Sequence, residues 1–410
     1  MRLTSSLCRQ HIQRMFKKHW HVQRNRRVAD TRMEDVLIAK NLRVIDPKEL
    51  FIKPKTRLDI SIEPLVPKPH PVNNSHPDWQ DTPCLSYRDD NVLLEGENQA
   101  MVLTKTVLIA NELPETVNNL MIDHNEQVNK LVLRALHTSH IFDAHQELLP
   151  KRKDPARPAW VFPREYGITD LRRTRYISQN LFQLCESLSG PQVAFERNLI
   201  HNGIVKVPIE KDGNLLQFTL RADLLLASTS PLKAIGSKED GNHINLPDLH
   251  PIDSTITLKP ENVYKLQNLY PLDKKSQWMN AHTIFIYYDP AEVKNLYETP
   301  VTETQIFGRS LLKSFAVAAS YARQRFGDEI VSLPEPVVIQ CIHSDGKFFH
   351  FSVFQLNTLD LNGSDGEKNL WWSSPKILLF ERAGYDVGKP IIEKYNPEVF
   401  KRIFAFYSNN

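Results

Sequence analysis

The chain has 410 residues, of which 41% are hydrophobic and 24% are charged. These values are typical of a globular protein, and the length suffices for one large or two ordinary domains with tails. No apolar run approaches the roughly 18 residues of a membrane-spanning helix, so no membrane span is predicted. Glycine occurs 14 times against 27 prolines. Because phosphate-binding loops need glycines, this balance counts against a nucleotide-dependent enzyme.

Residues 1–29 carry eight basic side chains and no acidic one. An arginine-rich, acid-free start with scattered apolar residues is typical of a mitochondrial transit peptide. The alternative is a basic arm that stays in the mature protein and binds RNA. Without these eight, 43 of the 51 basic residues remain against 48 acidic ones. A mildly acidic mature chain can bind phosphate only through local patches, so many of its contacts should be with proteins.

Residues 30–90 are predicted to form an extended arm rich in proline and lysine. Eight prolines fall between residues 46 and 83. Proline fixes φ and lacks an N–H group, so this stretch favours extended or polyproline conformations over helix. Such an arm could cross the surface of a partner; the alternative is a disordered linker.

The folded body is predicted over residues 91–410, beginning near Leu93. In chain order, the pattern indicates a helix over residues 97–110 and one or two helices within residues 118–137. An amphipathic helix over residues 171–188 should end at Gly190. Residues 203–227 are predicted to form a hairpin around an Asp-Gly turn.

The helix predicted over residues 304–326 has the clearest signals. Thr302 with glutamine three residues later is a capping-box pattern. Its apolar stripe is predicted to face the core, while Arg309 and Lys313 lie on another face. A strand precedes it at residues 283–288, and the last helix should begin at the Asn396-Pro397 pair.

Residues 337–342 and 347–356 are predicted to form a buried β-hairpin. The Asp345-Gly346 pair between them is a strong signal for a two-residue turn. Closing the hairpin at this turn would place Val338 opposite Val353 and Ile342 opposite Phe349.

These elements mix strands and helices without regular βαβ alternation, so the predicted fold class is α+β. We expect a mixed sheet with this C-terminal β-hairpin, packed by amphipathic helices and preceded by the extended N-terminal arm. The body could form one unit or two lobes that meet near Asn268.

A basic cluster surrounds residues 151–175 and is interleaved with Trp160, Phe162 and Tyr166. Arginine beside aromatic rings suits phosphate contacts and stacking on unpaired bases. We therefore predict an RNA-facing loop; the alternative is a solvated loop whose arginines pair with acidic neighbours or partner proteins. The candidate RNA-binding residues are Lys151, Arg152, Lys153, Arg157, Arg164, Arg172, Arg173 and Arg175.

Residues that could support catalysis or metal binding do not form a recognised constellation. The histidines at positions 137, 140 and 145 lack the i, i+4 spacing of helical metal ligands, and the four cysteines form no CxxC pair. His343 and His350 flank the Asp345 turn and are expected at the edge of the sheet, hydrogen-bonded or exposed. The loop at residues 363–369 resembles a phosphate loop but lacks its spacing, so we expect a polar turn that exposes Lys368. No catalytic, cofactor or metal residue is predicted.

Four segments resemble a known family, and they occur in the family's order. They are HFSVFQLNTLDLN with the following GEKNL (residues 350–370), LLEGENQAMVLTKTVLIANELPE (residues 93–115), NLFQLCE (residues 180–186) and NPEVFKRIFAFYSNN (residues 396–410). They are similar to the mitochondrion-specific ribosomal proteins that include large-subunit proteins thirty-seven and thirty.

The resemblance implies a structural constituent of the mitochondrial large ribosomal subunit, located in the matrix and not an enzyme. The partners it implies are the large-subunit rRNA and other large-subunit proteins, including the related protein thirty. Two alternatives stay open. They are a free RNA-binding or translation factor of the matrix, and a matrix enzyme with an unrecognised site.

Overall fold

The computed structural model divides into two units, Met1–Pro69 and His70–Asn410. Within the first unit, α2 (Glu34–Ala39) is helical, in a part of the predicted arm that precedes its prolines. The predicted transit peptide, residues 1–29, lies outside the described residues. The residues that the structure describes are 34–43, 45, 71, 73–141, 147–149, 151, 156–157, 159–161, 166–250, 255–296, 299–386 and 389–410.

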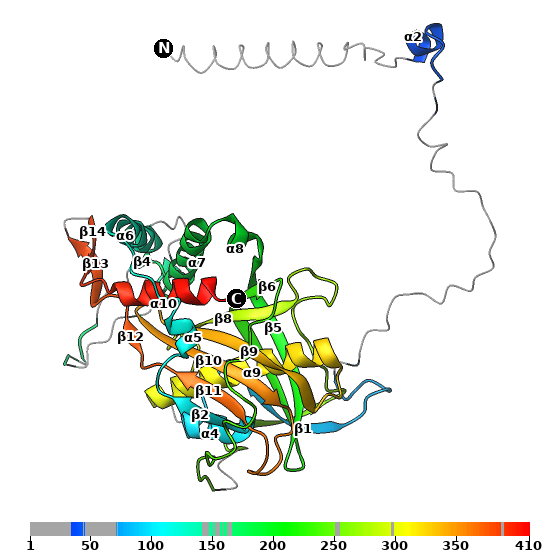
Figure 1. The fold of residues 1–410 in the computed structure, drawn as a ribbon, viewed down its shortest axis with the longest axis vertical. Coiled ribbons are helices and arrows are strands. Elements are labelled where there is room, and N and C mark those ends of the chain that lie inside the picture. The colour runs from blue at the N-terminus through cyan, green and yellow to red at the C-terminus, as the bar shows by residue number, and fades with distance from the viewer. Residues whose placement is uncertain are drawn as a thin grey trace, which may run out of the picture. The chain divides into compact units, whose positions relative to one another are not determined.

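A ten-stranded mixed sheet organises the second unit, in the order β2-β11-β10-β9-β8-β6-β1-β7, with β12 paired to β10 and β5 to β6 (Figure 1). The pairs β1–β6, β8–β9 and β2–β11 are parallel, and the other pairs are antiparallel. The predicted α+β class is therefore confirmed. The strands are β1 (Thr82–Arg88), β2 (Thr106–Ala110), β5 (Arg197–Lys211), β6 (Asn214–Ser228), β7 (Lys259–Val263), β8 (Asn280–Tyr287), β9 (Ser332–Ser344), β10 (Phe348–Thr358), β11 (Asn369–Ser373) and β12 (Ile377–Leu378).

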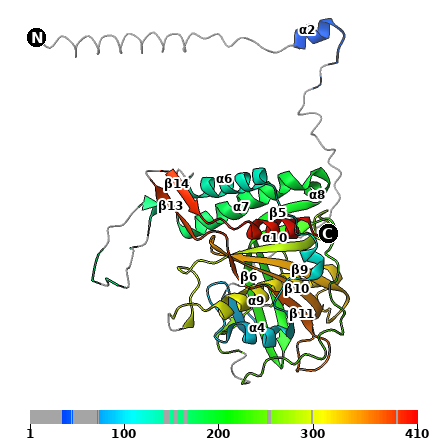
Figure 2. The ribbon, with the colours of Figure 1, turned by 60° about the vertical axis from the view of Figure 1, so that its left-hand side comes forward.

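Helices cover both faces of this sheet (Figure 2). One apolar core lies beneath α4 (Gly96–Thr104) and α9 (Glu303–Phe326). The other core lies beneath four helices, and successive side chains of a strand alternate between the two: Trp371 belongs to the first core and Trp372 to the second. The four helices are α5 (Glu115–Asn118), α6 (Glu126–Ile141), α7 (Asp170–Ser189) and α10 (Pro397–Ser408).

Two predicted helices differ from the structure. The first ends at Thr104, because Lys105 takes the left-handed conformation (φ 47°) and the β-branched stretch after it forms β2 instead. The second, α6, begins later than predicted, where the Asn125 side chain accepts a hydrogen bond from the backbone N–H of Val128 at 2.9 Å. The helix ending before Gly190 is confirmed, and α8 (Pro191–Phe195) follows it directly.

The β5–β6 hairpin is confirmed and is longer than predicted. Its turn consists of Asp212 and Gly213, both with positive φ (48° and 77°), as a two-residue turn between twisted strands requires. The strand β1 lies before the predicted start of the folded body and pairs with β6 and β7.

The β9–β10 hairpin is also present, but its predicted register is wrong by two residues. Ile342 pairs with Phe351 rather than Phe349, and Val353 pairs with Gln340. The Asp345 carboxylate accepts hydrogen bonds from the backbone N–H groups of Lys347 at 2.7 Å and Phe348 at 2.8 Å, which widens the turn. A shift of two residues leaves every side chain on its predicted face.

Helix α9 begins with the predicted capping box at Thr302, but it is buried on all sides. Every residue from 308 to 322 is buried, so the position predicted for Arg309 and Lys313, outside the core, is corrected. On the side away from the sheet, α9 crosses the start of α4 with almost no gap. A Cβ atom on Gly308 would lie 2.5 Å from the carbonyl oxygen of Gly96, so only glycine fits there.

The two buried cations of α9 are held by Asp89, which follows β1. The Lys313 Nζ lies 2.6 Å from the Asp89 carboxylate and donates a hydrogen bond to the carbonyl of Arg221 at 2.7 Å. Arg309 donates to the carbonyl of Tyr287 at 3.0 Å and lies 3.9 Å from the same carboxylate. Burial acts to raise the pKa of Asp89, but the two cations outweigh it and lower that pKa. Asp89 is therefore ionised and neutralises charge that would otherwise be buried alone.

We expect Asp89→Asn to lower the free energy of unfolding by about 3 kcal/mol, because removing one partner of a buried ion pair leaves the other uncompensated. Chemical denaturation of the full chain measures this. The neighbouring Asp90→Asn is the matched control, since Asp90 pairs with Lys259 at 2.9 Å where both side chains are about half exposed. Its loss should stay below about 1 kcal/mol. Equal losses in the two variants would contradict the role assigned to Asp89.

Candidate functional site

The predicted RNA-facing loop lies between two short strands, β3 (Glu147–Leu148) and β4 (Tyr166–Gly167), which pair with each other. Lys151 and Arg157 are exposed, and the side chain of Trp160 is 63% exposed. Tyr166 is 69% exposed. Exposed aromatic and basic side chains thus both occur in this segment. The candidates Arg152, Lys153 and Arg164, and also Phe162, lie outside the described residues.

The other three candidates lie in the first turns of α7, which is capped by the Thr169 hydroxyl accepting from the Arg172 N–H at 3.4 Å. The Arg172 guanidinium pairs with Glu147 at 3.2 Å, and Arg173 pairs with Asp170. Arg175 is exposed. The structure therefore brings Arg172 and Arg173 into pairs with acidic neighbours, whereas Lys151, Arg157 and Arg175 present their charge to solvent.

A cavity of about 350 Å³ lies beside the start of α7, between that helix and the β9–β10 turn. Its walls carry carboxylates (Asp170, Asp345 and Glu381) as well as cations such as Arg173 and Arg382. Burial raises the pKa of Asp345, and the hydrogen bonds from backbone N–H groups only partly oppose this. A cavity of such mixed charge does not select for a polyanion.

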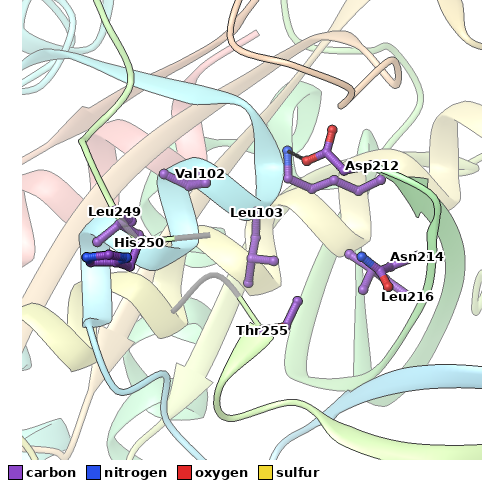
Figure 3. A pocket seen from close by; sticks show the side chains of 9 residues that line it. Val102, Leu103, Asp212, Asn214, Leu216, Leu249, His250 and Thr255 are labelled. Carbon is purple, nitrogen blue, oxygen red and sulfur yellow. Dashed lines mark ion pairs between the residues drawn. The ribbon is translucent and has the colours of Figure 1, made fainter. Parts of the chain in front are cut away.

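A second cavity of about 350 Å³ lies between α4 and the tip of the β5–β6 hairpin (Figure 3). Leu103 and Leu216 line it, with Lys211 and Asp212 forming an ion pair at 3.4 Å. Burial lowers the pKa of Lys211. Its Nζ also donates a hydrogen bond to the carbonyl of Leu361 at 2.7 Å, so the lysine ties the hairpin tip to the loop after β10. These contacts make Lys211 a structural cation of the loop.

His343 and His350 lie in the interior of the sheet rather than at its edge, so the predicted placement is corrected. The two residues pair directly across β9 and β10, and both are fully buried. The Ser310 hydroxyl of α9 bridges them, 2.9 Å from Nδ1 of His343 and 3.1 Å from Nδ1 of His350. The Asp345 carboxylate is bound in the turn and is not one of these hydrogen-bond partners.

One assignment of protons satisfies this network. Ser310 donates to the carbonyl of Ile306 at 3.1 Å, so its oxygen can accept an N–H from each imidazole. The Nε2 atom of His350 then accepts from the Ser373 hydroxyl at 2.9 Å, and that of His343 accepts from Arg309 at 3.4 Å.

Both imidazoles are neutral in this arrangement. Burial lowers the pKa of His350 to about 3. Burial, reinforced by the charge of Arg309, holds the pKa of His343 well below its usual value. The pair is a satisfied polar network in the core, with no proton to exchange near neutral pH.

Lys368 was predicted to be exposed in a polar turn, but it is buried, so this prediction is also corrected. It is 4% exposed, and its Nζ donates a hydrogen bond to the carbonyl of Ile244 at 2.9 Å. In the described part of the chain, no three or more His, Cys, Asp or Glu side chains lie together in a way that could bind a metal ion. The helices of that same part include none with the length and hydrophobicity of a transmembrane helix. His145, the third member of the histidine group, lies outside that part.

The neutral histidine pair predicts an acid-sensitive fold. A histidine whose pKa falls on folding contributes stability that is complete above its ordinary pKa of 6.5 and is lost as the pH falls toward about 3. In His350→Gln, which cannot titrate, the free energy of unfolding should decline by about 1.4 kcal/mol less per pH unit between pH 6 and pH 4. Denaturant titrations at several pH values measure this slope.

The exposed His243→Gln is the matched control for that experiment, because it makes the same replacement outside the core. If His350→Gln and the control gave the same slope, the neutral buried state of His350 would be refuted.

Comparison with known proteins finds this chain to be similar to mitochondrial ribosomal proteins. The model of the family described as "Mitochondrial 28S ribosomal protein S30 (PDCD9)" matches residues 312–410. The large ribosomal subunit protein mL37 of Rattus norvegicus is 29% identical over 84% of this chain and 79% of its own length. The proteins of the same name from Mus musculus and Bos taurus are 29% and 28% identical over 80% and 82% of this chain, and over 76% and 78% of their own lengths. The resemblance indicated by the four sequence segments is thereby confirmed, and it extends over about four-fifths of the chain.

Proposed function

We propose that this chain is a structural constituent of the mitochondrial large ribosomal subunit in the matrix, where it supports mitochondrial translation through contacts with proteins and rRNA. The observation that carries the proposal is the extent of the similarity. Curated proteins named large ribosomal subunit protein mL37 match 80–84% of this chain and 76–79% of their own lengths.

The family description and the names of the curated relatives point to different ribosomal subunits. We give more weight to the curated relatives, because their similarity covers more of the chain. The family description names a 28S ribosomal protein but covers only residues 312–410. The curated relatives match about four-fifths of the chain. We therefore assign the chain to the large subunit. We also propose the related mitochondrial ribosomal protein thirty as a partner, and this rests only on the family resemblance of the sequence.

The buried polar groups support a structural role rather than an enzymatic one. Ser310, His343 and His350 would be the natural candidates for acid–base chemistry, yet their polar atoms bond to one another and to Ile306, Arg309 and Ser373 inside the sheet. The buried cations Lys313 and Lys211 are likewise bound by carboxylates and carbonyls of the protein itself. Side chains used in this way stabilise a scaffold.

Contact with rRNA is proposed at the exposed cations Lys151, Arg157 and Arg175 and at the exposed ring of Trp160. Lysine and arginine displace counterions from phosphates, and an exposed indole can stack on an unpaired base. The paired arginines Arg172 and Arg173 then position this surface rather than supply its free charge.

Sedimentation of lysed mitochondria tests the assignment. In magnesium the chain should migrate with the assembled ribosome and the free large subunit. In EDTA, which separates the subunits, it should stay with large-subunit rRNA. Migration with the small subunit would contradict the assignment to the large one, and a peak at the top of both gradients would favour a free factor or an enzyme.

Reversal of the three exposed charges tests the RNA-contact surface. In the combined Lys151→Glu, Arg157→Glu and Arg175→Glu variant, we expect release from purified large subunits at lower salt. If each side chain contacts one phosphate, the slope of log affinity against log salt should fall by about two to three.

The matched control reverses three exposed lysines elsewhere on the body, Lys233, Lys274 and Lys275, and changes the net charge equally. Release of both variants at the same salt would show a general charge effect. Release of the test variant at the wild-type salt concentration would exclude this surface as an rRNA contact.

A further inference from the structure

A smaller cavity, of about 290 Å³, lies where the parallel strands β2 and β11 end and α10 passes by. Asn111 and Glu112 line it from the end of β2, Ser374 from the end of β11, and Arg402 from α10. Because β2 is the last strand of the sheet order, the cavity lies at the outer edge of the molecule's main sheet, where another protein can approach.

The Arg402 side chain on α10 is partly exposed, but part of its guanidinium is buried. Its Nε and Nη1 atoms are buried and have no hydrogen-bond acceptor among the described residues. Arg197, Arg309 and Arg323 each have one such nitrogen, but among the described arginines only Arg402 has two. Arg197 also donates to the carbonyls of Tyr407 at 3.2 Å and Asn409 at 2.6 Å, whereas no such bond is found for Arg402 among the described residues. Two buried donors on one guanidinium thus remain unused.

The Arg402 guanidinium cannot remove its unpaired charge by losing a proton. Burial lowers the pKa of Arg402 and Glu398 only partly opposes it, but an arginine side chain stays charged in proteins. The guanidinium carbon lies 5.9 Å from the centre of the Phe351 ring, which helps to hold its position. A fixed cation with unused buried donors gains most from an oxygen acceptor that carries negative charge.

We propose that this cavity receives the carboxylate of an acidic side chain from a neighbouring protein of the assembled particle, which pairs with Arg402. The inference rests on the proposed function. The volume of the cavity suits one side chain, and the exposed amide of Asn111 offers a further donor. Glu112 in the wall repels the many charges of a phosphate backbone more strongly than one carboxylate, so rRNA is the less favoured ligand.

The first test compares the isolated full chain with the assembled particle, using Arg402→Met. In the isolated chain the melting temperature should equal or exceed that of the wild type, because the guanidinium has no acceptor of its own to lose. In competition with wild type for incorporation into large subunits, the variant should be about ten-fold or more depleted. A lower melting temperature or equal incorporation would overturn the proposal.

Lys401→Met is the matched control on the same helix. It removes ion pairs within the chain, so it should lower the melting temperature of the isolated chain while leaving incorporation near the wild-type level. In every comparison the wild type must migrate with the large subunit. If it does not, the proposed function fails, whereas equal incorporation of Arg402→Met alone defeats only this inference.

The second test identifies the occupant. A benzophenone amino acid incorporated at position 111 of the full chain should, after irradiation of purified large subunits, attach to a protein segment that contains Asp or Glu. Attachment to rRNA would assign the cavity to phosphate instead. Attachment to a segment without an acidic residue, or to nothing, would refute the proposal.

Discussion

The ion pair between Lys313 and Asp89 allows a helix with two cations to lie inside the protein. From residue 308 to residue 322, α9 has no exposed side chain, so the charges of Arg309 and Lys313 must be compensated within the fold. Asp89 compensates them from the loop after β1, at 2.6 Å from the lysine. This carboxylate therefore joins β1, β6 and α9, because it also accepts a hydrogen bond from the N–H of Arg221 at 2.6 Å.

The buried position of α9 restricts where the neighbouring helix and strands can lie. Gly96 and Gly308 bring α4 against it at backbone distance, and the Ser310 hydroxyl reaches through to the histidines of β9 and β10. The central helix is thus bound to the sheet by polar contacts as well as by apolar packing. A body built in this way uses its buried charges for its own cohesion. The contacts proposed above therefore fall to groups that reach the surface, such as the exposed Lys151 and the partly exposed Arg402.

Local signals in the sequence were sufficient to predict the positions of most helices and strands. They were not sufficient to predict which side chains are buried or which partners those side chains contact. The capping box at Thr302 and the Asp212-Gly213 turn act within a few residues, and both predictions are confirmed. The burial of Lys313 depends on its ion pair with Asp89, which lies more than 200 residues earlier in the chain. The periodicity of a helix cannot reveal so distant a partner. The register of the β9–β10 hairpin was missed for a local reason, since the Asp345 side chain competes for the backbone N–H groups of the turn. Arg402 was missed because orphaned donors appear only when the surroundings of a side chain are known.

The pairing of β2 with β11 has a consequence for how the chain folds. Asn369 donates a hydrogen bond to the carbonyl of Thr104 at 2.9 Å, across 265 residues of sequence. The entropy of closing so long a loop is lost before the contact yields any stability, so topologies of this kind reach the native state slowly. Until residues 369–373 are in place, β2 has no strand partner and the edge of β10 that pairs with β11 is open. Before β11 is in place, a chain with these open strand edges is therefore prone to aggregation.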